Sequence, residues 1–301
     1  MYKKEKILVI YHKGCWDGFG AAYAYWSFRQ TAPSYILDES EVTYLAMNYD
    51  EPIPDFTGYS LVYILDYSFK LPVMREILSK YPYETINTHF VNIDHHEGAL
   101  PLRKIKDRNF EFIYDGDQSG ASLSWMEFYR NLYITRSNRY PLFIAYIRDR
   151  DLHRFELPES KAVNAYIRTH KQTFDNCIKL SNEIENDFDK IVEIGKIILE
   201  YNETLIEEIL QKVHFINLFG YRIPVVNNSV MCSEVAETLY IRHNTPFAAC
   251  YFNRSDGKRQ WSFRSKKGFN LLEVGKEMKI GGHSSACGVE QDRNIPIIIV
   301  E

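Results

Sequence analysis

The chain has 301 residues, of which 45% are hydrophobic and 25% are charged, and this length allows two compact domains with buried cores. The formal net charge of −4 gives no electrostatic basis for tight binding to long duplex nucleic acid, so any nucleic-acid ligand should be short. The five cysteines are scattered and form no CxxC pair, which argues against a disulfide framework and a structural zinc site and favours a reducing cytoplasm. The apolar stretch at residues 7–11 is too short for a signal sequence or a membrane span, so no membrane association is expected.

Three apolar runs in the first third of the chain each end in a polar cluster. Their β-branched and aromatic residues, and their lack of alternation, predict strands that are buried on both faces. Helical patterns separate the runs, and the order βαβαβ is typical of an α/β protein with a parallel, doubly wound sheet. The expected strands are residues 6–12, 60–67 and 89–96, and the expected helices are residues 18–29, 71–80, 119–132 and 139–150.

The amino-acid composition and the expected secondary structure change twice in the remainder of the chain. Residues 175–213 are rich in Glu, Lys, Ile and Leu at helical spacing, which predicts one long connecting helix. The β-rich segments beyond it predict a second, smaller α/β domain, with strands at residues 220–228, 246–253, 259–265 and 296–301. We therefore expect an N-terminal domain at residues 1–172, a helical linker at residues 173–215 and a C-terminal domain at residues 216–301.

Aspartate and histidine residues gather at the ends of the three N-terminal strands. Ligands of an open parallel sheet collect at the carboxyl ends of its strands, so these side chains should face one crevice. Carboxylates and imidazoles packed this closely must be paired or must coordinate a cation. Oxygen and nitrogen ligands favour manganese or magnesium, and two such ions sharing a carboxylate can promote hydrolysis of a phosphate ester. The residues are His12 and Asp17, then Asp66, then Asp94, His95 and His96.

Each of these residues alone has a simpler explanation. An aspartate at a strand end more often caps a turn or a helix, and a single histidine such as His12 is more often hydrogen-bonded than metal-bound. The coincidence at three strand ends, together with the adjacent run of Asp94, His95 and His96, favours the metal site.

Taken in order, five motifs resemble those of the DHH phosphoesterase superfamily, over nearly the whole chain. The resemblance implies a DHH catalytic domain followed by a substrate-binding domain, and two manganese ions that serve to hydrolyse phosphoester or phosphoanhydride bonds. Substrates in that family range from single-stranded DNA and very short RNA to cyclic dinucleotides, 3′-phosphoadenosine phosphate and polyphosphate. The motifs are HKGCWDG at residues 12–18, Asp66 in ILDYS, Asp94-His95-His96 in NIDHHEG, Asp149 in YIRDRDLH and Gly281-Gly282-His283 in GGHSSACG.

The resemblance also implies a role for each matching residue. Asp94 and His96 would act as catalytic residues beside the metals, with His96 assisting the leaving group. Asp149 is preferred over Asp151 as a ligand, while Asp151 stays an alternative ligand, a partner of a ligand or a cap. The implied metal ligands are His12 and Asp66 for one ion, and Asp17, Asp66, His95 and Asp149 for the other, so that Asp66 bridges the two.

The first motif departs from the family pattern at one position. Most members carry two aspartates, separated by one residue and followed by glycine, whereas Cys15 stands at the first of these positions and Asp17 at the second. A thiolate can coordinate manganese but is a softer ligand than a carboxylate; in the simpler alternative, Cys15 packs against the following helix. We expect one strong metal site and one weaker or metal-selective site.

The C-terminal domain contributes candidate substrate-binding residues. Gly281 and Gly282, before His283, suit a backbone that approaches a phosphate closely, although an ordinary glycine turn is the simpler reading. Arg264 in WSFRS could bind a terminal phosphate in bidentate fashion or could be a solvated arginine at a strand edge.

These features predict a cytoplasmic, manganese-dependent phosphohydrolase, with magnesium as an alternative ion. Its substrate should be a short oligonucleotide or a small phosphorylated nucleotide. A polyphosphate or pyrophosphate hydrolase is the runner-up, and Cys15 leaves open a weakened member that binds a nucleotide as a sensor. The oligomeric state stays open, with a homodimer as one alternative.

Overall fold

The computed structural model describes residues 5–31, 40–49, 51–83, 88–130 and 140–300. The chain divides into two compact units, Met1–Leu199 and Glu200–Glu301. The division falls inside the helix α8 (Phe188–Leu210), which lies in the part of the chain expected to be the linker.

The first unit is built on a parallel sheet of five strands in the order β2-β1-β3-β4-β5. The predicted α/β class with a parallel sheet is confirmed. The three expected strands are β1, β3 and β4, whereas β2 and β5 were not expected. The bounds are β1 Lys6–His12, β2 Glu41–Met47, β3 Leu61–Leu65, β4 His89–Asp94 and β5 Phe110–Tyr114.

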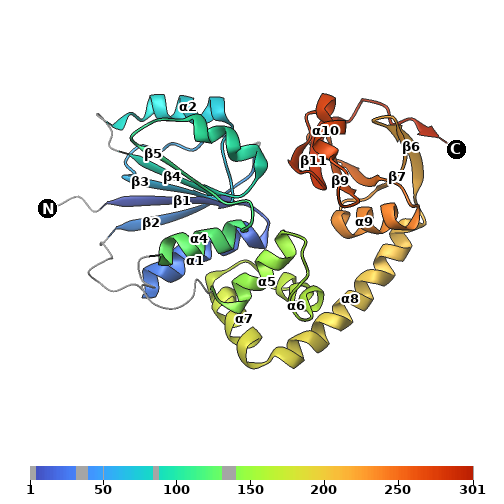
Figure 1. The fold of residues 1–301 in the computed structure, drawn as a ribbon, viewed down its shortest axis with the longest axis horizontal. Coiled ribbons are helices and arrows are strands. Elements are labelled where there is room, and N and C mark those ends of the chain that lie inside the picture. The colour runs from blue at the N-terminus through green and yellow to red at the C-terminus, as the bar shows by residue number, and fades with distance from the viewer. Residues whose placement is uncertain (1–4, 32–39, 50, 84–87, 131–139, 301) are drawn as a thin grey trace. The chain divides into compact units, whose positions relative to one another are not determined.

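Helices cover both faces of this sheet (Figure 1). On one face, Ile7 and Val9 of β1 pack against α1 (Trp16–Thr31) and α4 (Gly120–Tyr129). On the other face, Leu8 and Ile10 belong to the core formed with α2 (Leu71–Lys80) and the 3-10 helix η1 (Glu97–Lys104). Because the strand order reverses between β1 and β3, the segments that leave these two strands diverge at their carboxyl ends, which is where open α/β sheets usually bind ligands.

Four helices follow the sheet: α5 (Leu142–Asp151), α6 (Ser160–Arg168), α7 (Phe174–Asn186) and α8. The single helix expected at residues 175–213 is therefore two helices. The break lies at Asp187, next to Asn186, and both residue types are weak helix formers. It allows Phe188 to turn into the core beside Tyr146.

The second unit contains a mixed sheet in the order β10-β11-β9-β8-β7-β6-β12, in which only β7 and β8 pair in parallel. Helix α9 (Cys232–Arg242) packs on one face, and α10 (Leu271–Val274), followed by the short 3-10 helix η2 (Lys276–Met278), packs on the other. The strands are β6 His214–Leu218, β7 Tyr221–Asn227, β8 Phe247–Asn253, β9 Lys258–Ser265, β10 Gly281–His283, β11 Ala286–Asp292 and β12 Ile299–Val300.

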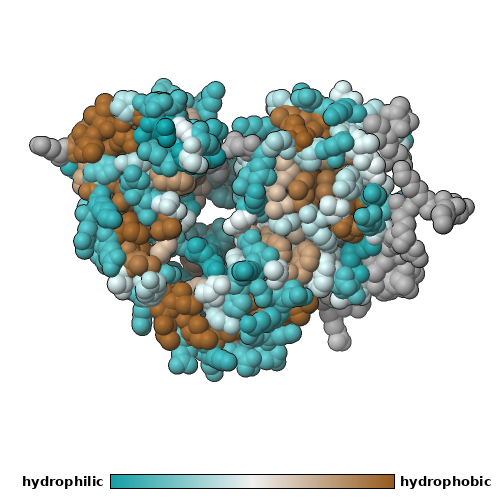
Figure 2. All heavy atoms as spheres, turned by 180° about the vertical axis from the view of Figure 1, so that it is seen from behind, coloured by the Kyte–Doolittle hydropathy of each residue, from teal (hydrophilic) through white to brown (hydrophobic). Residues whose placement is uncertain are grey.

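The surface shown in Figure 2 is mainly hydrophilic, with apolar patches that polar residues separate. Among the described residues, none of the helices combines the length and the apolar character needed to cross a membrane.

Candidate metal centre

The carboxylate of Asp66 lies at the centre of the site. Asp66 follows β3 directly, is 1% exposed and has a left-handed backbone with φ of 53°, and its N–H donates to the carbonyl of Ile93 at 2.9 Å. Its Oδ2 lies 3.6 Å from Nδ1 of His12 and 3.5 Å from Sγ of Cys15. Its Oδ1 lies 3.1 Å from Nε2 of His95. The two oxygens of one carboxylate thus face two different groups of potential ligands.

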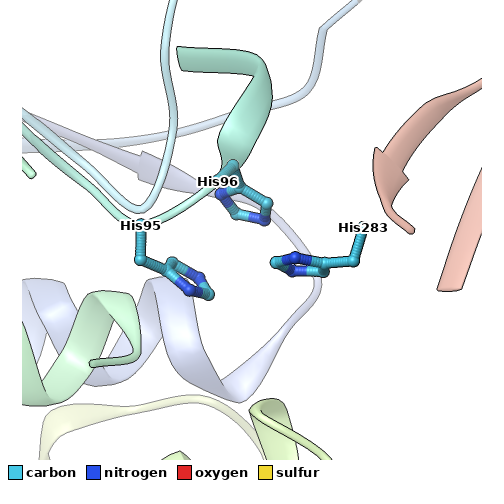
Figure 3. Close-up of side chains that lie close together, drawn as sticks. All are labelled: His95, His96 and His283. Carbon is cyan, nitrogen blue, oxygen red and sulfur yellow. The ribbon is translucent and has the colours of Figure 1, made fainter. Parts of the chain in front are cut away.

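His95 connects Asp66 to two further carboxylates. Its Nε2 lies 3.5 Å from Oδ2 of Asp17, in the first turn of α1, and 3.5 Å from Oδ2 of Asp151, the last residue of α5. Figure 3 shows the side chains of His95 and His96 leaving the segment between β4 and η1. One imidazole is therefore surrounded by three carboxylates, from β3, α1 and α5.

Because these carboxylates lie close together, positive charge is needed to stabilise their ionised forms. Burial disfavours the imidazolium, yet hydrogen bonding to Asp66 and its charge raise the pKa of His95 to about 10. Burial and the charges of Asp151 and Asp66 raise the pKa of Asp17 well above its usual range. Burial opposes ionisation of Asp66 too, but hydrogen bonds from His12 and His95 hold its pKa well below the usual range. A divalent cation would balance the excess negative charge, and these nitrogen and oxygen donors fit manganese or magnesium.

Asp94 positions the ring of His96. Oδ1 of Asp94 accepts the backbone N–H groups of His95 at 2.7 Å and His96 at 3.1 Å, and lies 2.7 Å from Nδ1 of His96. Its Oδ2 accepts the hydroxyl of Ser68 at 2.5 Å. Burial disfavours the charged form of His96, but the hydrogen bond to Asp94 and the charge of Asp94 stabilise the imidazolium. The net effect is a raised pKa of His96. These contacts make Asp94 a positioning residue, and its contact with a reacting group stays a prediction.

This arrangement is supported by two residues that the sequence analysis did not single out, Asn92 and Ser68. Asn92 is fully buried on β4 and donates to the carbonyls of Ile64 at 3.1 Å and Tyr67 at 2.9 Å. Its Oδ1 accepts from Ser68, the residue that also binds Asp94. The sequence signal that could have identified Asn92 is a polar residue inside an otherwise apolar strand, since a buried amide must find hydrogen-bond partners.

Asp149 and Asp151 have different roles in the structure. The carboxylate of Asp149 is buried and accepts the backbone N–H groups of Glu156 at 2.9 Å and Leu157 at 3.2 Å, so it fixes the loop after α5. Asp151 is the one that reaches His95. The geometry therefore favours Asp151 as the ligand, although Asp149 was preferred from the sequence.

Helix α4 begins against two of the candidate ligands, Asp17 and Asp66. Asp17 accepts the backbone N–H groups of Gly120 at 2.6 Å and Ala121 at 3.0 Å, at the positive end of this helix. A Cβ atom on Gly120 would lie 2.4 Å from Cβ of Asp66. Only glycine lets the helix start this close to the central carboxylate.

Cys15 caps helix α1. Its Sγ accepts the N–H of Gly18 at 3.1 Å, the position that an N-cap side chain usually binds, and lies 3.6 Å from Nδ1 of His12. Burial and the charges of Asp66 and Asp17 raise the pKa of the Cys15 thiol well above its usual range. Cys15 thus stands beside His12 and Asp66 as a third potential ligand, in its neutral form when no metal is bound.

The candidate substrate-binding residues of the second unit share one face of its sheet. Arg264 of β9 pairs with Ala286 of β11, which pairs with His283 of β10, and residues paired in this way point to the same side. Arg264 lies on an interior strand and donates to the hydroxyl of Ser233, in the first turn of α9, at 2.5 Å. A guanidinium and a helix N-terminus therefore lie together, which suits an anion.

The two glycines before His283 differ. Gly282 has a φ of +124°, and a Cβ there would lie 2.7 Å from the carbonyl oxygen of Ala286, so the pairing of β10 with β11 requires glycine. A Cβ on Gly281 would meet nothing within 4 Å. The backbone at Gly281 is open to the approach of a ligand.

Comparison with known proteins yields relatives without assigned functions. No family model matches the chain. The chain is 25% identical over 308 aligned positions to the uncharacterized protein R106 of Acanthamoeba polyphaga mimivirus, covering 96% of this chain and 68% of that protein. It also aligns with an uncharacterized protein of Helicobacter pylori G27, at 12% identity and a TM-score of 0.40, over 98% of this chain and 95% of that one.

Replacing Asp151 with Asn should weaken Mn²⁺ binding roughly tenfold or more, without lowering the melting temperature. The Asp149→Asn variant should do the reverse, because it weakens the acceptor of two backbone N–H groups, at a cost of about 1–3 kcal/mol in stability. Isothermal titration and thermal unfolding of both variants separate the two roles. Equal loss of metal affinity in both would contradict the assignment of Asp151.

The Gly120→Ala variant should lose metal affinity and about 1–3 kcal/mol of folding free energy, because the added methyl group pushes α4 away from Asp66. Gly98→Ala is the matched control, since a Cβ there meets nothing within 4 Å. Denaturant unfolding and Mn²⁺ titration of the two variants provide the measurement. If Gly120→Ala behaved like Gly98→Ala, the close packing of α4 on Asp66 would be refuted.

Proposed function

We propose that the chain is a manganese-dependent phosphohydrolase that cleaves phosphodiester bonds in short oligonucleotides or small nucleotides. The observation that supports this most strongly is the carboxylate of Asp66, whose two oxygens face two ligand groups. Two metal sites that share a carboxylate suit hydrolysis of a phosphate ester, because the pair can stabilise both the attacking and the leaving oxygen. The groups are His12, Cys15 and Asp66 on one side, and Asp17, Asp66, His95 and Asp151 on the other.

Manganese, when bound, would supply Lewis acidity and lower the pKa of a coordinated water. The residues of the chain would hold the ions and the phosphate and move protons. His96 is suited to proton transfer, because the bond from Nδ1 to Asp94 fixes its ring and leaves Nε2 as the nitrogen directed away from Asp94. Proton donation from His96 to the leaving oxygen would then be coupled to breaking of the phosphoester bond.

The second unit supports a phosphate-containing substrate. Arg264 has five N–H donors, and its bonds to Ser233 and to the carbonyl of Phe263 use two of them. A hydrogen bond with Cys250 and the positive charge of Arg264 lower the pKa of Cys232, at the start of α9, against the effect of burial. This positive environment favours an anion such as a terminal phosphate.

One observation favours a second candidate function. Cys15 stands where the resemblance to DHH phosphoesterases predicts a carboxylate, and a neutral thiol at this position would weaken the ligand group on the Oδ2 side of Asp66. A chain with one weak ion site could bind a nucleotide without efficient turnover and act as a sensor. Tight nucleotide binding without product release would support this alternative.

The state of the cysteines indicates the kind of cellular compartment in which the protein works. All five are free thiols, and three of them, Cys177, Cys250 and Cys287, are buried. We infer that the protein works in a reducing compartment such as the cytoplasm, where such thiols persist.

The Asp66→Asn variant should reduce Mn²⁺-dependent release of mononucleotides from a labelled dinucleotide to the level measured without metal. The matched control is Asp189→Asn, an exposed aspartate on α8, which should keep full activity. The same assay with cyclic dinucleotides, 3′-phosphoadenosine phosphate, polyphosphate and pyrophosphate identifies the preferred substrate. Absence of hydrolysis for all of them with Mn²⁺ would overturn the proposed activity.

The His96→Ala variant should lower kcat by roughly 10²–10⁴-fold on a nucleotide substrate, because the leaving oxygen loses its proton donor. The loss should be much smaller on a p-nitrophenyl phosphoester, whose leaving group needs no proton. His243→Ala, an exposed histidine at the end of α9, serves as control. An equal loss on both substrates would exclude the role of His96 as the acid.

A further inference from the structure

A second surface of the first unit carries a concentrated positive charge. Two adjoining grooves of about 650 Å³ and 270 Å³ lie where the end of η1 and the start of β5 meet α2. Both grooves are lined by residues 105–107. They lie at the edge strand of the parallel sheet, where the first three residues of β5 line the larger groove.

The lining of the grooves is basic. Five exposed cations line them, against the acidic residues Asp107 and Glu111. In the part of the chain that the structure describes, none of the five is in an ion pair. A protein with a net charge of −4 thus keeps a local excess of positive charge, five cations against two carboxylates. The five are Arg75, Arg103, Lys104, Lys106 and Arg108.

Aromatic rings accompany these cations. The guanidinium of Arg103 lies 4.8 Å from the ring centre of Tyr114, and that of Arg108 lies 5.3 Å from the ring centre of Tyr83. Phe110 and Phe112 of β5 line the larger groove, whereas the two tyrosines lie against the arginines that line it, and Tyr83 is 39% exposed. Cations that follow a groove, with aromatic faces beside them, are the combination that binds the phosphates and bases of a single strand.

We propose that these grooves bind the phosphate backbone of single-stranded nucleic acid. An acidic peptide would use the charges but would gain little from the aromatic rings, so the combination favours the nucleic acid. This inference takes its substrate class from the proposed function, on which it rests. It adds a binding site for the part of a longer strand that lies beyond the cleaved bond.

The position of η1 relates the grooves to the metal centre. The helix begins directly after His96 and ends at Lys104, and eight residues of 3-10 helix span about 16 Å. The grooves therefore lie at the far end of the helix that starts at the catalytic histidine. A dinucleotide held at the metal centre would not reach them, whereas a longer oligomer would.

The test measures binding of fluorescent single-stranded RNA of 2, 4, 8 and 12 nucleotides to the full chain by anisotropy. EDTA is present, so that binding is separated from hydrolysis. The Lys104→Gln/Lys106→Gln variant should bind the 12-mer roughly tenfold or more weakly, and its slope of log affinity against log salt should fall by about 1.4, since each single-strand contact contributes about 0.7. The matched control is Lys171→Gln/Lys190→Gln, which removes two exposed lysines elsewhere in the first unit and should bind like the unaltered chain.

Equal affinity of the two double variants for the 12-mer would overturn the inference. So would tight binding of polyglutamate by a chain that does not bind RNA, because the grooves would then select acidic peptide. The assay also separates this inference from the proposed function. Binding of the 12-mer without Mn²⁺-dependent hydrolysis of any oligomer contradicts the enzyme alone, and hydrolysis with no dependence on Lys104 and Lys106 contradicts the grooves alone.

Discussion

A carboxylate as deeply buried as that of Asp66 is stable only where polar or charged partners balance it, and His12 at the end of β1 and His95 after β4 lie against its two oxygens. The left-handed backbone at Asp66 costs about 1–3 kcal/mol, and the bond from its N–H to Ile93 holds it in place. The start of α4 then packs against Asp66 through Gly120. Three features therefore depend on one another: the pairing of β3 with β4, the position of α4 and the arrangement of the candidate ligands. A change in any one of them should alter the others.

The topology of the sheet explains why these side chains meet. Chain connections diverge after β1 and β3, and side chains at the carboxyl ends of the strands can meet at such a point. His12 closes β1, Asp66 follows β3 and Asp94 closes β4, so neighbouring strands deliver donors at the same level. Asp17 and Asp151 come from helices that pack near this edge. The fold brings together residues from about half of the chain length.

The sequence was sufficient for the parts of the fold that are buried on both faces. Runs such as KILVIYH and HFVNIDHH are long enough and apolar enough to predict β1 and β4, whereas β2 and β5 contain exposed and half-buried positions that give no such signal. The choice between Asp149 and Asp151 could not be made in the same way. Residues two apart on a helix point about 200° apart, and which of them faces the crevice depends on how α5 packs, which the sequence pattern does not encode.

Cys15 stands where the resemblance to DHH phosphoesterases predicts an aspartate, and it can keep one role of that residue while it alters another. As an N-cap it binds the N–H of Gly18, a role that aspartate also performs. As a potential ligand it differs, because a thiol whose pKa is raised by burial and by Asp66 carries no charge where aspartate would carry one. The group on the Oδ2 side of Asp66 therefore offers no carboxylate besides Asp66 itself, whereas the group around His95 also includes the carboxylates of Asp17 and Asp151. In the enzyme that we propose, a first cation should therefore bind on the His95 side, and binding of a second ion beside Cys15 should depend more strongly on the softness of the metal.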